Sequence, residues 1–354
     1  MPDRPLPAPR RRRRLLPALL AGALALLLAA TLAACGSSDD ADADAGTAAA
    51  GGGATTSAPS TERASVTLAL DWFAQPSSGG PYAAQDAGLY DRAGLDVTIQ
   101  PGTAHATSVQ IVGAGRAQFG LETAENIIQA RAQGIPVVAL AATLQRSPAA
   151  LFFHEGQPIS SYRDLDGRVV YTQIGAPQWI YQKRKYGLDD VKDRQFAGSY
   201  AAFAQDETAV AQGYLTSTPA QLEAQGLKVR ALPNPEAIGY GSVLFTTEKE
   251  IAEHPDVVRR FVAATAAGWE RYRTDVPGVS SVLAREAKGR TVADLEAEGR
   301  AQEAFIWTGD AAQAWGAMTR ARWQAVADEL LKEGAIRSPV DVDAAFTTEF
   351  LPAS

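Results

Sequence analysis

The sequence predicts an α/β protein built from parallel sheets, and three observations support this. Apolar residues alternate with small or polar ones at Val66, Leu68 and Leu70, as in a half-buried strand. The continuous apolar run VVALAA within residues 136–143 is typical of a central strand of a parallel sheet. Helical segments that end at glycine separate such runs, so strands and helices alternate. This order predicts parallel strands joined by right-handed crossovers.

Residues 1–34 have the features of an export leader. Arginines at 10–14 precede an apolar run over 15–30, and Leu32-Ala33-Ala34-Cys35 resembles the site cut by lipoprotein signal peptidase. An uncleaved membrane anchor is the alternative, because the run approaches the ~20 residues that span a bilayer. A lone cysteine followed by a polar segment favours the lipoprotein. We therefore expect lipidation at Cys35 and a body anchored at the outer face of the cell membrane, whether the leader uses the Sec or the twin-arginine route.

Residues 35–63 are rich in Ser, Asp, Ala, Gly and Thr and contain no aromatic residue. Such a segment cannot bury enough surface to offset the entropy of ordering, so it predicts a flexible tether. Cys35 is the only cysteine, which excludes disulfides and thiol chemistry from the body. Removing the leader takes away six arginines and one aspartate and moves the formal charge from −7 to −12. An acidic body argues against nucleic-acid binding.

The first lobe is expected over residues 64–153. Its first strand is followed by a loop that begins at Asp71, and Ser78 and Pro81 are typical of the start of the next helix. Ligands of open α/β sheets lie beyond the carboxyl ends of the strands, so the loop 71–82 is the first predicted wall of a binding site. The remaining expected elements are helices over 82–87, 108–114 and 124–133, the last capped by Thr123, and strands over 95–99, 118–121, 136–143 and 149–153.

The second lobe is expected over residues 154–240, and the chain then returns to the first lobe over 241–354. The elements expected in the second lobe are a strand over 169–171, a helix from Gln178, a helix over 207–213 and a strand over 214–215. A strand over 239–247 then returns the chain to the first lobe. Two crossings form a double-strand hinge, which suits closure on a solute. Amphipathic helices are predicted over 255–273, 293–306 and 310–333, with Trp269, Trp307, Trp315 and Trp323 in the core, like the pair Phe152-Phe153.

The segment LDWFAQPSSGGPYAAQDAGLYDRAGLDVTI, with VGAGRAQFGLETAENIIQARAQGIPVVALAA and AVAQGYLTSTP further on, resembles a known family. It is similar to the ABC-transporter substrate-binding proteins for nitrate, sulfonates, taurine and the thiamine pyrimidine precursor, over residues 66–273. The resemblance implies a type II periplasmic-binding-protein fold and a ligand in the cleft between the lobes. It also implies an ABC permease and ATPase as partners, a monomer, and neither catalysis nor a cofactor.

The predicted ligand-binding residues lie at strand ends or in first helical turns. Trp72 is the strongest candidate, because a ring in a loop beside glycines can stack on a flat ligand and its indole N–H can donate a hydrogen bond. The alternative for Trp72 is that its ring only fills the edge of the lobe, and each of the other residues could instead be a turn former or part of the core. The full set is Asp71, Trp72, Gln75, Tyr82, Glu122, Thr123, Gln145, Tyr171, Thr172, Trp179, Tyr214, Thr216 and Tyr240.

Three acidic residues bear on the charge of the ligand. Asp71, Glu122 and Glu125 fall in the loops expected to line the cleft, and these loops carry no Arg or Lys. A desolvated carboxylate repels a bound anion, whereas it accepts hydrogen bonds from ring N–H or amino groups. The sequence therefore favours a small planar nitrogen-containing compound, such as an aminopyrimidine, over nitrate, taurine or an alkanesulfonate. The alternative for Glu122 is an exposed acid that favours the start of a helix.

Two other functions remain as alternatives. Enzymes of the same fold that make the thiamine pyrimidine carry a cysteine-rich motif, which this chain lacks, and a surface sensor would act without a permease. The histidines, His105, His154 and His254, have no metal-ligand spacing, and the sequence contains neither a nucleophile elbow nor a P-loop.

Overall fold

The computed structural model describes residues 63–354 apart from 103–106, 235–237, 313 and 354. The predicted leader, the tether as far as residue 62, with Cys35, and His105 lie outside the described residues. Residues 59–354 form one compact unit, which contains every described residue. Among the described residues, no helix is both long and apolar enough to cross a membrane.

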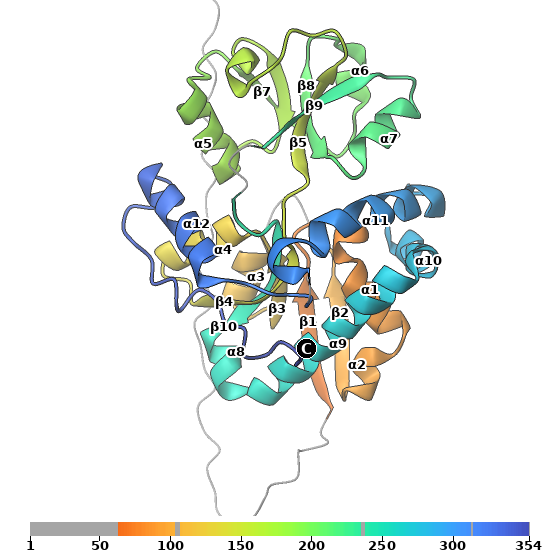
Figure 1. Cartoon of the computed structure of the whole chain (residues 1–354), viewed down its shortest axis with the longest axis vertical. Coiled ribbons are helices and arrows are strands. Elements are labelled where there is room, and N and C mark those ends of the chain that lie inside the picture. Colours follow the sequence, from red (N-terminus) through yellow and green to blue (C-terminus); the bar gives the residue numbers. More distant parts are fainter. Residues whose placement is uncertain (1–62, 103–106, 235–237, 313, 354) are drawn as a thin grey trace, which may run out of the picture. The chain divides into compact units, whose positions relative to one another are not determined.

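The first sheet has five strands in the order β2-β1-β3-β10-β4 (Figure 1). β1 lies between β2 and β3 and is parallel to both, whereas β10 is inserted antiparallel between β3 and β4. The sheet is therefore mixed, because the chain returns from the second lobe and enters it from the opposite end. The strands are β1 (Ala64–Ala69), β2 (Leu95–Gln100), β3 (Phe119–Glu122), β4 (Val137–Leu144) and β10 (Ser242–Thr247).

Helices α1 (Gly79–Asp86), α2 (Leu89–Arg92) and α9 (Pro255–Thr274) cover one part of this sheet. α1 and α9 lie side by side (Figure 1) and approach closely, since a Cβ at Gly268 would stand 2.2 Å from the carbonyl oxygen of Gly80. Ser78 stands at the N-cap position of α1 as expected, but its side chain makes no capping hydrogen bond; its hydroxyl donates to the carbonyl of Gln75 (2.9 Å) instead. Thr107 and Thr123 cap α3 (Ser108–Gly113) and α4 (Ala124–Ala132), and each accepts a hydrogen bond from the backbone N–H three residues on.

The second sheet also has five strands, in the order β7-β6-β8-β5-β9. β6 is parallel to β7 and β8, and β5 is antiparallel to β8 and β9. Separate apolar clusters lie beneath this sheet, one around Phe153 and Trp179 and one around Phe203. Its elements are β5 (Ala149–His154), β6 (Val169–Thr172), α5 (Pro177–Tyr186), β7 (Lys192–Gln195), α6 (Ala201–Gln205), β8 (Val210–Tyr214), α7 (Thr218–Glu223) and β9 (Val229–Pro233).

Two sequence predictions for this region differ from the structure. The predicted helix over 207–213 is wrong, because residues from Val210 onward form β8, which is paired on both sides. Pairing with two neighbours overrides the local pattern here. β5 belongs to the second sheet, so the first crossing lies at 145–148, one strand earlier than predicted. β9 ends at Pro233 and β10 begins at Ser242, so the second crossing, by which the chain returns to the first sheet, lies between these two strands.

The C-terminal part packs on the first sheet through α8 (Glu248–Glu253), α10 (Val276–Glu286), α11 (Val292–Ile306) and α12 (Arg320–Lys332). Trp269, Trp315 and Trp323 are buried as predicted, and Trp307 is partly buried against the same core. The single helix predicted over 310–333 is wrong in its first half. There the chain runs along β4, and the N–H of Ala142 donates to the carbonyl of Gly316, whose φ of 86° a helix does not allow.

Candidate functional site

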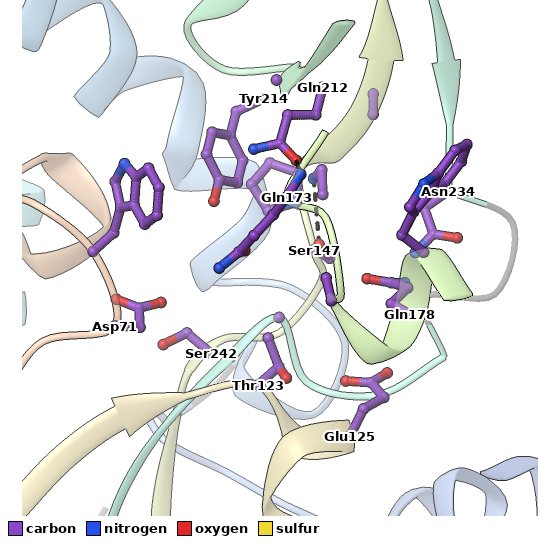
Figure 2. Close-up of a pocket in the computed structure, with 18 of the residues that line it drawn as sticks. Asp71, Thr123, Glu125, Ser147, Gln173, Gln178, Gln212, Tyr214, Asn234 and Ser242 are labelled. Carbon is purple, nitrogen blue, oxygen red and sulfur yellow. Dashed lines mark hydrogen bonds between the residues drawn. The ribbon is translucent and has the colours of Figure 1, made fainter. Parts of the chain in front are cut away.

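A cavity of about 440 Å³ is lined by residues of both sheets and of the segments that join them. Figure 2 shows Asp71, Thr123, Glu125 and Ser242 on one side of it and Gln212 and Tyr214 on the other. The first group follows β1 and β3 or begins β10, and the second lies on β8. The volume falls in the range of about 300–1,000 Å³ that is usual for small-molecule sites. The prediction of a cleft at the strand ends therefore agrees with the geometry.

Carboxylates dominate the side formed by the first sheet. Glu122 is almost fully buried at the end of β3, where its Oε1 accepts hydrogen bonds from the N–H of Thr123 (3.0 Å) and the amide of Asn126 (2.9 Å). The hydroxyl of Ser108 lies 3.2 Å from Oε2. Glu125, in the first turn of α4, accepts a hydrogen bond of 3.2 Å from the N–H of Gly239.

Burial raises the pKa of all three acids. It raises the pKa of Asp71 to about 7, with repulsion from Glu122 as the second cause, and backbone N–H groups oppose the shift in part. Burial also raises the pKa of Glu122 and of Glu125 against the hydrogen bonds that they accept. Near neutral pH the Asp71 carboxyl is therefore divided between its two forms. It can donate a hydrogen bond when protonated and accept one when ionised.

The side formed by the second sheet presents amides. Gln212 Oε1 accepts hydrogen bonds from the N–H of Gln173 (2.9 Å) and from the hydroxyl of Thr172 (3.2 Å). Both bonds use the amide oxygen, so the amide NH₂ is left to donate to a ligand. Gln173, the residue after β6, and Gln212, on the neighbouring strand β8, thus lie close together, as Figure 2 shows.

Aromatic rings line both sides. Trp72 follows β1 and meets Phe73 edge to face, with 5.3 Å between ring centroids. Tyr214, at the end of β8, is 37% exposed although it lines the cavity. A large ring on each side, each open to solvent in part, gives a flat ligand two surfaces on which to stack.

Positive charge is scarce in the described lining. Arg290 is its only lysine or arginine, and the guanidinium lies 2.8 Å from a carboxylate oxygen of Glu298. An anionic ligand would therefore meet carboxylates and one guanidinium that already has a partner. A neutral or basic ligand would meet acceptors and amides.

Most of the predicted site residues line this cavity. For these residues a role in binding stays a prediction, and Trp179 is mainly a core residue, since it is 3% exposed and its indole N–H donates to Asp193 (2.8 Å). The predicted residues that line the cavity are Asp71, Trp72, Gln75, Glu122, Thr123, Thr172, Trp179, Tyr214 and Thr216.

Four predicted site residues lie outside the cavity. Tyr82 is buried in the core beneath α1, and Tyr171 packs against the cluster around Phe203. Their position at a strand end or a first helical turn is as expected, but their side chains point to the interior of a lobe.

Gln145 and Tyr240 are the other two, and both are structural. The fully buried amide of Gln145 donates to the carbonyl of Ala317 (2.8 Å). The fully buried Tyr240 has its hydroxyl 2.8 Å from the N–H of Thr319, which donates to it. Both side chains hold the C-terminal segment against the crossings and leave none of their surface for a ligand.

Sequence reasoning missed several lining residues. Gln212 was not predicted because the pattern of residues 207–213 indicates a helix, whereas Val210–Tyr214 form a strand. Gln173 lies in the loop expected between the strand over 169–171 and the helix from Gln178, but nothing in the sequence distinguishes its side chain. Glu333 directly follows α12, and the position of this helix beside the cavity depends on the tertiary fold. Glu125 was identified as an acid of the cleft but not as a binding residue.

Two mixed sheets joined by two crossings, with the cavity between their strand ends, define the fold of the two-lobed solute-binding proteins. Residues 75–275 match the family model described as NMT1/THI5 like, and the chain belongs to this family.

Relatives and solved structures agree with this assignment. The riboflavin-binding protein RibY of Chloroflexus aurantiacus is 25% identical over 309 residues, covering 81% of this chain and 86% of RibY. The 4-amino-5-hydroxymethyl-2-methylpyrimidine phosphate synthase of Legionella pneumophila is 24% identical over 250 residues, which cover 65% of this chain and 76% of the synthase. The alkanesulfonate-binding protein SsuA of Xanthomonas axonopodis pv. citri, solved with bound MOPS, superposes with a TM-score of 0.62 at 16% identity. The superposition covers 81% of this chain and 99% of SsuA.

Proposed function

We propose that this protein is the extracytoplasmic, lipid-anchored solute-binding component of an ABC importer. In this proposal it captures a small planar nitrogen-containing compound, such as a flavin or an aminopyrimidine, and presents it to a permease and its ATPase. Ligand binding favours a closed arrangement of the lobes because the ligand contacts both, and the closed form docks.

The chemistry of the cavity wall carries this proposal. Asp71, Glu122 and Glu125 supply acceptors, and the amide of Gln212 supplies a donor. Ring nitrogens, amino groups and carbonyls of a heterocycle match such a set, and Trp72 and Tyr214 provide the stacking surfaces. An alkanesulfonate or nitrate would have to approach buried carboxylates without a free cation in the described lining.

The relatives support the ring class. One is named as a riboflavin-binding protein and another as a synthase of a phosphorylated aminopyrimidine, and both names refer to flat nitrogen heterocycles. The sulfonate-binding neighbour supports the fold alone, because its identity to this chain is 16%.

Binding, rather than synthesis, is the activity that we propose. The synthases named among the relatives are the specific reason to weigh catalysis. Against it, the only cysteine of the chain is Cys35, at the predicted lipidation site, so the body has no counterpart of the cysteine-rich motif expected of such an enzyme. The leader and Cys35 motif support placement outside the cytoplasm.

A thermal-shift screen tests the proposal. Riboflavin, 4-amino-5-hydroxymethyl-2-methylpyrimidine, taurine, ethanesulfonate and nitrate are added separately to the purified protein. A ligand that binds only the folded state stabilises it by RT ln(1 + [L]/Kd). We expect a shift with at least one of the two heterocycles and a smaller one in the Trp72→Ala variant. A shift with a sulfonate or nitrate alone would refute the proposed ligand class.

A further inference from the structure

The end of the cavity between α5 and α12 holds two polar atoms that lack partners. Among the described residues, neither the hydroxyl of Tyr181 nor Oε2 of Glu333 makes a hydrogen bond, and both atoms are shielded from solvent. Both residues line the cavity, and the side chain of Glu333 is only 7% exposed. A buried polar group that is left without a hydrogen-bond partner destabilises the fold, and a charged group does so more strongly.

The surrounding polar groups are already engaged. Lys185 Nζ lies 3.6 Å from the other oxygen of Glu333 and 5.1 Å from the ring centroid of Tyr181, over which it stands. The amide of Gln182 donates to the side chain of Asn234 (2.8 Å). Lys185 therefore holds the carboxylate by one oxygen, and the second oxygen remains without a donor.

The charges at this end select an uncharged partner. Lys185 would repel a ligand cation, and Glu333 together with Glu329, which is 3.6 Å from Lys185, would repel an anion. A hydroxyl group is an uncharged partner that suits either of these atoms, because it can donate to a carboxylate and accept from a phenol.

We infer that the α5–α12 end of the cavity is a subsite for a hydroxylated, uncharged chain attached to the planar ring of the ligand. The inference rests on the proposed function, which places the ring beside Trp72. It also explains why the cavity, at about 440 Å³, is larger than a single pyrimidine ring fills.

Riboflavin and lumiflavin test this subsite, because they share one ring system and differ in a ribityl chain against a methyl group. Affinities of both are measured by fluorescence quenching with the wild type, Tyr181→Phe and Glu333→Ala. Tyr181→Phe removes one hydroxyl and keeps the ring beneath Lys185. We expect the wild type to bind riboflavin at least tenfold more tightly than lumiflavin. The affinity for riboflavin should fall up to about tenfold in Tyr181→Phe and about ten- to a hundredfold in Glu333→Ala, whereas the affinity for lumiflavin should not change in either variant.

Glu329→Ala is the matched control, since both oxygens of Glu329 have lysine partners, Lys185 and Lys332. It should reduce riboflavin binding far less than Glu333→Ala. Equal affinities for the two flavins, or equal losses for both in the variants, would overturn the subsite and leave the proposed function standing.

If neither flavin binds, the flavin form of the proposed function is refuted, and ribitol then decides on the subsite. Ribitol carries the hydroxyls without a ring, and at high millimolar concentration it should stabilise the wild type more than Glu333→Ala in thermal unfolding. Equal stabilisation of the two would overturn the subsite on its own.

Discussion

Replacement of Asp71 by asparagine should stabilise the ligand-free protein, and only above mildly acidic pH. Burial beside Glu122 raises the pKa of Asp71 from 3.8 to about 7. The folded state therefore binds a proton that the unfolded state has lost between pH 4 and 7, so the free energy of unfolding falls as the pH rises through this interval. Above pH 7 Asp71 is ionised in both the folded and the unfolded state, so the loss of unfolding free energy that its buried charge causes is constant.

The size of the effect follows from the shift in pKa. Three units at 1.36 kcal/mol each set an upper value of about 4 kcal/mol, and because Asp71 is only partly buried we expect about 1–3 kcal/mol. Asparagine has a similar shape and no charge, so its folded state carries no such cost. The difference in unfolding free energy between Asp71→Asn and wild type should be near zero at pH 4 and reach its full value at pH 8.

Urea unfolding from pH 4 to 8 measures this difference. Asp96→Asn serves as the control, since Asp96 is exposed on β2 of the same sheet and its replacement should leave the profile unchanged. A variant Asp71→Asn that tracks the wild type across the whole range, or that is less stable at pH 8, would refute the reasoning.

Three further predictions concern the site and its support. Trp72→Ala should weaken heterocycle binding by about 1–3 kcal/mol, roughly 5- to 150-fold, with Trp72→Phe losing less, as measured by titration calorimetry. Gly268→Ala should lower the free energy of unfolding, measured with urea, by about 1–3 kcal/mol, because the new Cβ would stand 2.2 Å from a carbonyl oxygen of α1. The control Ala263→Ser, at an exposed position of the same helix, should leave the stability nearly unchanged. Arg322 donates hydrogen bonds to the carbonyls of Gln145, Ile238 (2.9 Å) and Gly239 (2.8 Å). Arg322→Gln should therefore lower the free energy of unfolding by at least about 2 kcal/mol and speed amide hydrogen exchange in both crossings. Unchanged exchange in the crossings would contradict this prediction.

Sequence patterns predicted best the parts of the fold that local chemistry determines. The cap at Thr123, the buried run of β4 and the amphipathic α9 each carry their own signal, and the structure confirms all three. The patterns failed where pairing decides, as at β8, whose alternation within 207–214 is short and whose neighbours lie far away in sequence. The return of β10 between β3 and β4 likewise depends on long-range pairing.

For the site, the carboxyl ends of the strands indicated the correct loops but not the direction of each side chain. Trp72 and Glu122 line the cavity, whereas Tyr240 turns inward beneath α12, where its ring packs against Trp323 in a tilted arrangement with 5.7 Å between ring centroids. The difference between a cavity wall and a core is set by which helix covers the residue. Glu333 shows the reverse case, since nothing local to α12 indicates that its carboxylate meets α5.

The central claim is that the cavity takes an uncharged or weakly basic planar nitrogen heterocycle and not a small anion. Isothermal titration of the purified protein at pH 7.5 with riboflavin, with 4-amino-5-hydroxymethyl-2-methylpyrimidine and with ethanesulfonate tests it most directly. We predict saturable binding of at least one heterocycle and no detectable heat of binding for the sulfonate. Tight binding of ethanesulfonate with neither heterocycle bound would contradict the account.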